Sequence, residues 1–152
     1  MLLVEWKPEF SVGVERFDEE HRHLISLLNQ LQVALADQRE NLILGAILKE
    51  LVWYTRSHFK AEEVLMKRYA YPGLVSHRAE HDRFREKVAQ FVDHFQCGRA
   101  VIAVEVSDAL LEWLIDHILQ CDAAYADFFR CNGIADVGDL QGLSANCQGA
   151  LS

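Results

Sequence analysis

Four long segments of this chain repeat apolar residues with the 3.6-residue period of an α-helix, and no segment shows the period of two that marks a half-buried strand. Gly98 ends the third segment, Asn132 and Gly133 end the fourth, and Pro72 breaks the chain between the second and third. Long helices with short connections pack as antiparallel neighbours. The pattern therefore predicts an all-α, antiparallel up-down-up-down four-helix bundle, with helices over about 18–37, 41–68, 74–95 and 103–130.

The chain has 152 residues, the size of one globular domain. We expect residues 1–131 to form the bundle with an apolar N-terminal arm packed across it, and Asp18 to cap the first helix. Residues 132–152 are rich in small and polar side chains, and we expect a loosely attached C-terminal tail there.

Charge and composition exclude some partners. The formal net charge is -8, with 15 basic residues scattered among 23 acidic ones, so nucleic acid is not an expected partner. Glu5 and Lys7 interrupt the apolar N-terminus, which lacks the pattern of a signal peptide, and no uncharged stretch is long enough to span a bilayer. We expect a cytoplasmic protein, a monomer as the simplest case, and four cysteines that are mostly free thiols because none has paired spacing.

Five histidines and two carboxylates recur at spacings that fit one metal cluster. Residues four apart on a helix share a face, which aligns His58 with Glu62 and His77 with His81. Asp122 comes five positions after His117. On an α-helix this spacing turns the second side chain by roughly 140° from the first, which suits an Asp that bridges two metals. The candidate ligands are His21, His58, Glu62, His77, His81, His117 and Asp122.

A single histidine on an apolar helix face is usually a hydrogen-bonded core residue. Five histidines on the apolar faces of four helices, however, would be costly to bury without a metal. Seven ligands exceed the four of a structural zinc site, and Cys121 is the one cysteine near the register. Nitrogen ligands with bridging carboxylates suit two first-row ions such as iron. With Glu62 and Asp122 as bridges, the histidines divide three to one metal and two to the other, which keeps an open position.

Five apolar residues lie next to the candidate ligands in sequence or one helical turn away. We expect them to cover the open position, admit a small ligand and exclude water, although the same residues would also be ordinary bundle core. They are Leu24, Phe59, Trp113, Leu114 and Ile118.

The motifs D-x-x-H from Asp18, H-F-x-x-E from His58, H-x-x-x-H from His77 and W-L-x-x-H-I-x-x-x-D from Trp113 resemble the hemerythrin family, in particular its single-domain bacterial members. The resemblance covers about residues 4–130. It implies an oxo- or hydroxo-bridged non-haem di-iron centre that binds O2 reversibly.

Carried over by position, the resemblance implies that His58, His77 and His81 hold the saturated iron, while His21 and His117 hold the iron that takes O2. It implies oxygen carriage, storage or delivery to oxygen-consuming enzymes, with NO and small anions such as azide as other ligands. Sensing of O2, NO or redox state through the same site is the alternative. The site has more histidines than carboxylates, the reverse of O2-cleaving di-iron enzymes, so we do not expect an enzyme.

Overall fold

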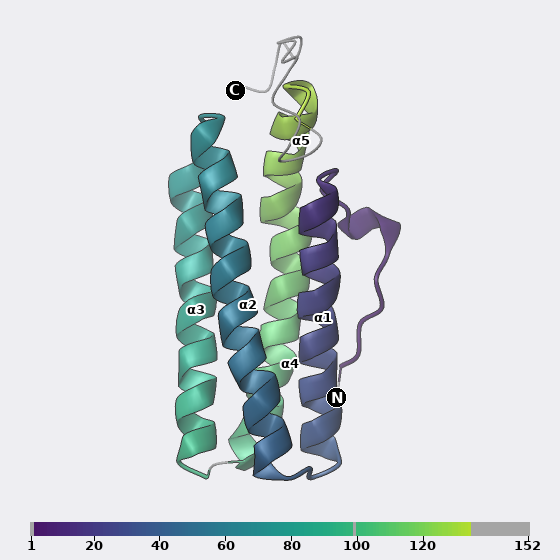
Figure 1. Cartoon of the computed structure of the whole chain (residues 1–152), viewed down its shortest axis with the longest axis vertical. Helices are drawn as coiled ribbons and strands as arrows, with labels where there is room; N and C mark the ends of the chain where they lie inside the picture. The colour runs from purple at the N-terminus through teal and green to yellow at the C-terminus, as the bar shows by residue number, and fades with distance from the viewer. Residues whose placement is uncertain (1, 99, 135–152) are drawn as a thin grey trace.

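The structure is a computed structural model that describes residues 2–98 and 100–134, with the backbone alone for residues 100–103. All regular elements of this described part are helical, as the sequence predicts (Figure 1). A short 3-10 helix precedes the bundle, and a π-helical turn interrupts its last rod. The elements are η1 (Pro8–Phe10), α1 (Glu15–Ala36), α2 (Asn41–Arg68), α3 (Leu74–Gln96), α4 (Ala100–His117), η2 (Ile118–Asp122) and α5 (Ala123–Cys131).

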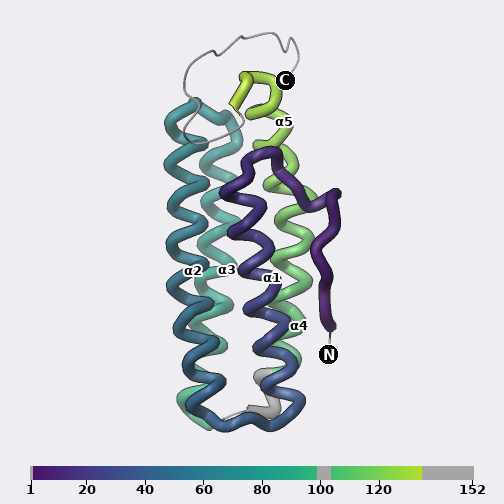
Figure 2. The backbone as a smooth tube through the Cα atoms, turned by 45° about the vertical axis from the view of Figure 1, so that its right-hand side comes forward, coloured from purple at the N-terminus to yellow at the C-terminus, as the bar shows by residue number. Residues whose placement is uncertain are grey.

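The helices form an antiparallel up-down-up-down bundle in which α4, η2 and α5 continue one another as a single rod (Figures 1 and 2). Helices α2 and α4 each pack against both α1 and α3, so α2 and α4 occupy diagonal corners. Consecutive helices therefore form two hairpins, α1 with α2 and α3 with α4, that lie side by side. None of the helices described is long and apolar enough to cross a membrane.

Each long helix ends at a residue with left-handed backbone. Gly98 and Gly133, predicted to end the third and fourth helices, have φ angles of 74° and 70°. Gln38 and Ala70 take the same conformation with φ angles of 52° and 53°. The following amide completes the cap after Ala70, where Tyr71 N–H donates to Met66 O at 2.8 Å.

The N-terminal arm packs on the α1 and α4 side of the bundle (Figure 2). The Asn29 side chain on α1 bonds both backbone groups of Val4, and the Leu2 amide donates to Asp108 on α4. The prediction that Asp18 caps the first helix is wrong, because α1 begins earlier, at Glu15. Asp18 instead accepts hydrogen bonds from the Val12 amide and the Ser11 hydroxyl, which fixes the turn that leads from the arm into α1.

The buried apolar side chains form two clusters. The large cluster draws mainly on α1, α2, α3 and α4, and the smaller one lies between the arm, α2 and α5. Phe17, Met66 and Tyr125 belong to the smaller cluster. Ile43, near the start of α2, is exposed although it is apolar. Ile134, assigned to the tail, is buried in the smaller cluster, and the rest of the predicted tail, residues 135–152, lies outside the described residues.

Candidate metal centre

The seven candidate ligands come from all four helical rods of the bundle and meet in one buried polar layer. Each is at most 4% exposed. Helix α1 contributes one histidine, α2 a histidine and a carboxylate, α3 two histidines, and the last rod a histidine and a carboxylate. They are His21, His58, Glu62, His77, His81, His117 and Asp122.

Glu62 lies between two sets of histidines. Its Oε1 atom is 3.2 Å from His21 Nε2 and 3.0 Å from His58 Nε2. Its Oε2 atom is 3.1 Å from His81 Nε2 and 3.6 Å from His77 Nε2. One carboxylate oxygen thus faces each set, which is the placement required of a carboxylate shared by two cations.

Asp122 has the same placement on the opposite side. Its Oδ2 atom is 3.2 Å from His21 Nε2, and its Oδ1 atom is 3.1 Å from Nε2 of both His77 and His117. The Asp122 carboxylate, like that of Glu62, therefore reaches both sets of histidines.

The histidines divide by hairpin and differ from the division implied by the resemblance. One set of mutually close ligand atoms contains His77, His81 and His117 with both carboxylates, and the other contains His21 and His58 with Glu62. The placement of His58 in the three-histidine set and of His117 in the two-histidine set is wrong. The reason is topological: α1 and α2 form one hairpin and α3 and α4 the other, so each set draws its histidines from one hairpin.

A π-helical turn brings His117 and Asp122 to one face. The prediction of a roughly 140° rotation assumed an α-helix through these residues. In the structure residues 118–122 form a π-turn, and the Ala123 amide reaches the Ile118 carbonyl. In a π-helix residues five apart lie one turn apart, so both side chains point at the same layer.

Six of the inward-facing ligand atoms lack hydrogen-bond partners. The Nε2 atoms of His77, His81 and His117 approach the carboxylate oxygens without hydrogen-bond geometry, and both Asp122 oxygens and Glu62 Oε2 are unpartnered. Buried nitrogen and oxygen atoms with no partner are costly. Their convergence from three rods fits the coordination of metal cations, to which both atom types are suited.

Buried charges shift the pKa values of the cluster when no metal is bound. Burial disfavours the imidazolium form of His21, but the neighbouring carboxylates of Asp122 and Glu62 outweigh it and raise the pKa to about 10. The same balance raises the pKa of His77 to about 9. Burial disfavours the Glu62 carboxylate, yet the surrounding histidines lower its pKa well below 4.5. Protons therefore provide the counter-charge that metal ions would replace.

Two carboxylates outside the predicted set orient histidines of the cluster. Glu20 Oε2 lies 2.6 Å from His58 Nδ1, and Glu63 Oε1 lies 2.9 Å from His81 Nδ1. Each carboxylate also pairs with an arginine, Arg16 for Glu20 and Arg85 for Glu63. A carboxylate on Nδ1 fixes the tautomer that presents Nε2 to a metal. Neither residue was predicted. The available signal was that each is an acid directly beside a candidate ligand in sequence, since Glu20 precedes His21 and Glu63 follows Glu62.

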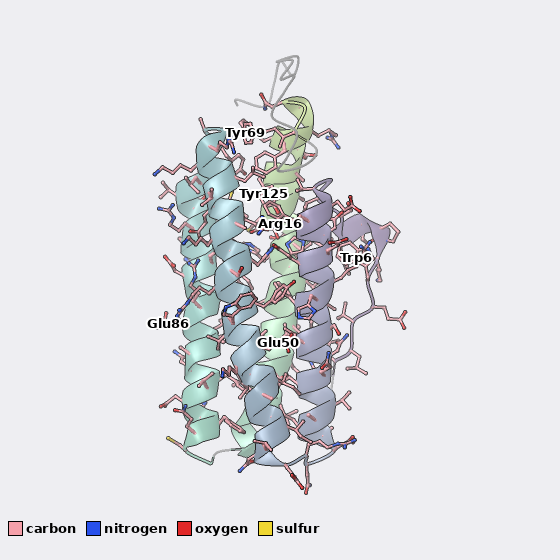
Figure 3. The ribbon with its side chains drawn as sticks, in the orientation of Figure 1. Trp6, Arg16, Glu50, Tyr69, Glu86 and Tyr125 are labelled. Carbon is pink, nitrogen blue, oxygen red and sulfur yellow. The ribbon has the colours of Figure 1, made fainter. Side chains whose placement is uncertain are left out.

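Tyr125 is a hydrogen-bond donor at the site. Its hydroxyl donates to Glu62 Oε1 at 2.6 Å, from a fully buried ring between the helices (Figure 3). Phe17 packs edge-on against both Tyr125 and His58. This aromatic layer closes the centre on the side of the arm and α5.

The five residues expected to cover an open metal position all belong to the large apolar cluster or pack against it. Phe59 stacks on His81 with ring centroids 3.8 Å apart, and Trp113 stacks on His117 at 4.5 Å. These two rings thus contact the three-histidine set. Leu24, Leu114 and Ile118 are buried in the same cluster.

His23 and the described cysteines do not belong to the cluster of candidate ligands. His23 pairs with Glu50 on the α1 and α2 surface. Cys121 is half-buried, with a thiol whose pKa burial raises, and belongs to neither set of ligands. Cys97 and Cys121 are free thiols, in line with the expectation of mostly free cysteines, whereas Cys131 is disulfide-bonded.

Comparison with known proteins agrees with this architecture. The family model described as the hemerythrin HHE cation binding domain matches residues 12–128. A bacteriohemerythrin of Stenotrophomonas maltophilia is 37% identical over 84% of this chain and 82% of its own length. One from Methylococcus capsulatus is 30% identical over 82% of this chain and 95% of its own. A crystal structure of wild-type hemerythrin superposes with a TM-score of 0.76 at 28% identity, covering 83% of this chain and 97% of that one.

Proposed function

Because this chain belongs to the hemerythrin family, we propose that it binds O2 reversibly at a centre of two iron ions held by the seven clustered residues. The observation that supports this most is the pair of shared carboxylates. Glu62 and Asp122 each offer one oxygen to the two-histidine set and one to the three-histidine set. A single cation would not need two such carboxylates.

The two sets of ligands suggest different roles. His77, His81 and His117 would hold one ion with three nitrogens, and His21 and His58 would hold the other with two. Two iron ions held by these residues would supply the electrons that O2 takes up on binding and returns on release. The set with fewer histidines leaves room for a small ligand, so we place O2 beside His21 and His58.

The chain's own residues would protect such a site in two ways. The apolar residues Leu24, Leu114 and Ile118 are each at most 1% exposed and would exclude water and charged species from the ligand position. Glu20 and Glu63 would hold His58 and His81 in the metal-binding tautomer. With few carboxylates among many histidines, the site favours binding over oxidative catalysis, and we propose carriage, storage or delivery of O2 rather than an enzyme.

The test is the visible absorption spectrum of the iron-loaded protein, reduced without oxygen and then cycled between O2 and argon. We expect two iron ions per chain and an absorption band that appears under O2 and disappears under argon. His81→Ala should lower the iron content, while replacement of His23, which lies outside the cluster, should not. One-way conversion to a stable ferric spectrum would contradict a reversible carrier.

A further inference from the structure

The outward side of α2 carries a stripe of cations and exposed apolar side chains. From Lys49 on, its members recur at intervals of three or four residues, with two neighbouring cations at the end, and Leu42 lies two turns before Lys49, so all of them line one side of the helix. Trp53 is 64% exposed and Val64 57% exposed, unusual for such large apolar side chains. We call this the α2 face; its residues are Leu42, Lys49, Trp53, Arg56, Lys60, Val64, Lys67 and Arg68.

The cations of the α2 face have no ion-pair partners in the described part of the chain. Elsewhere most arginines are paired, for example Arg16 with Glu20, Arg83 with Glu80 and Arg130 with Asp127. Cations at the end of a helix stabilise its dipole, which accounts for Lys67 and Arg68. Arg56 and Lys60 lie in the second half of α2 before its last turn, where that effect has faded.

Two hollows flank the α2 face. A groove of about 320 Å³ on the α1 side is lined by Arg16, Lys60 and Arg68 together with the apolar Val64. Figure 3 shows Arg16 at the start of α1. The groove thus combines three cations with an apolar wall, a suitable site for a carboxylate next to an apolar side chain.

The second hollow lies on the α3 side, with a volume of about 160 Å³. Arg56 and Arg85 line it, and so does Thr55, which is 2% exposed and whose hydroxyl has no hydrogen-bond partner. Arg85 is already paired with Glu63 and Asp82, so the unpaired cation at this hollow is Arg56, and Arg56 together with the unpartnered Thr55 hydroxyl is suited to bind a polar, negatively charged group from outside.

The diagonal helix has the opposite charge. Helix α4 contains no lysine or arginine, and Glu105, Glu112 and Asp116 are exposed on it. Because α2 and α4 occupy opposite corners of the bundle, the cations of the α2 face and the acids of α4 lie on opposite corners of the molecule. Such a separation orients an approaching charged partner before contact.

We propose that the α2 face is a docking surface for an acidic, amphipathic helix of a partner protein. Carboxylates of that helix would pair with Arg56, Lys60 and Arg68, and one apolar side chain would cover Trp53. A negatively charged membrane fits less well, because the basic stripe is narrow and acids stand beside it. Glu50 on α2 and Glu86 on α3 are exposed and would face a flat anionic surface (Figure 3).

The test uses the full-length, iron-loaded chain and a synthetic helical peptide. In this peptide glutamates recur every three or four residues along one face, and leucines recur at the same spacing along the neighbouring face. We expect saturable binding that weakens as salt rises, with a shift of the Trp53 fluorescence to shorter wavelength that Trp53→Phe removes. The double variant Arg56→Glu/Lys60→Glu should weaken binding by at least about tenfold. The matched control Lys7→Glu/Lys87→Glu changes the charge equally at exposed positions off the face, and should weaken binding by no more than about twofold.

Three results would overturn the proposal. Equal loss of affinity in both double variants would show that net charge alone attracts the peptide. Tighter binding to phosphatidylglycerol vesicles than to the peptide would assign the face to a membrane. Salt-sensitive self-association, abolished by Arg56→Glu/Lys60→Glu and also by Glu112→Lys on α4, would assign it to a second copy of this chain.

Discussion

His117 Nε2 lies 3.1 Å from Asp122 Oδ1, although Asp122 comes five positions after His117 in the sequence. The π-turn at residues 118–122 allows this contact because it adds one residue to the helical turn. The apolar faces of α4 and α5 on either side of it still point to the core. Ile118 and Asp122 are buried within it, whereas Leu119 and Gln120 are exposed. The extra residue is therefore accommodated on the solvent side.

Deletion of Gln120 should retain metal binding. It would restore a regular α-helix in which the histidine and the aspartate are four residues apart and still share a face. We expect unchanged iron content and an unfolding free energy no lower than that of the parent, measured by metal analysis and urea unfolding.

The control for that deletion is removal of Glu112, an exposed residue of α4 outside the π-turn. This deletion rotates the preceding part of α4 by about 100° relative to His117 and should abolish iron loading. Equal loss of iron in the two deletions would show that the π-turn itself is required.

The bundle could be predicted from sequence because apolar periodicity determines which side of each helix is buried. The second helix was predicted over the residues of α2, and Gly98 and Gly133 end helices as expected. The π-turn was not predicted, because a local change of helix type leaves no mark in the apolar pattern. The division of the histidines was missed because it depends on which helices pair in space rather than on the ligand spacing.

The contacts outside the ligand set were also missed, apart from Tyr125. Acidic side chains are frequent on solvent-facing helix positions, so nothing in the composition separates Glu20 from its exposed neighbour Glu19. The difference appears when His58, on another helix, is found 2.6 Å away.

Glu20→Gln should lower metal affinity by about 10- to 100-fold, because the carboxylate that orients His58 loses its charge. Glu63→Gln should have a comparable effect through His81. Competitive chelator titration of each variant measures the loss, and Glu19→Gln is the matched control. Parent affinity in both Glu20→Gln and Glu63→Gln would exclude a positioning role for these carboxylates.

Metal loading at pH 7 should release protons. His21 and His77, with metal-free pKa values of about 10 and about 9, are protonated at that pH and must lose their protons to bind a metal. Proton uptake by a weak buffer during titration with ferrous iron under argon measures the release. We expect more than about one proton per chain, and tighter binding as pH rises towards 9.

The same two groups predict opposite effects of pH on the metal-free and loaded proteins. Their pKa values in the metal-free fold lie above the ordinary 6.5, so their contribution to stability is fully present below pH 6.5 and is lost as pH rises through about 9 and about 10. Urea unfolding at pH 6.5 and pH 10 should show a loss of stability for the metal-free protein that the loaded protein lacks. Parallel pH profiles for the two forms would contradict this linkage.

Ala70→Gly should stabilise the protein. Ala70 ends α2 with a φ angle of 53°, where its Cβ atom is strained and glycine is not. Relief of this strain outweighs the greater freedom of glycine in the unfolded chain, and we expect a gain of roughly 0.5 to 1 kcal/mol in unfolding free energy. The matched control is Ala46→Gly, an exposed position inside α2, which should cost about 1 kcal/mol. Urea unfolding of both variants in the same metal state decides the matter, since a loss of stability in Ala70→Gly would show that the left-handed cap carries no strain.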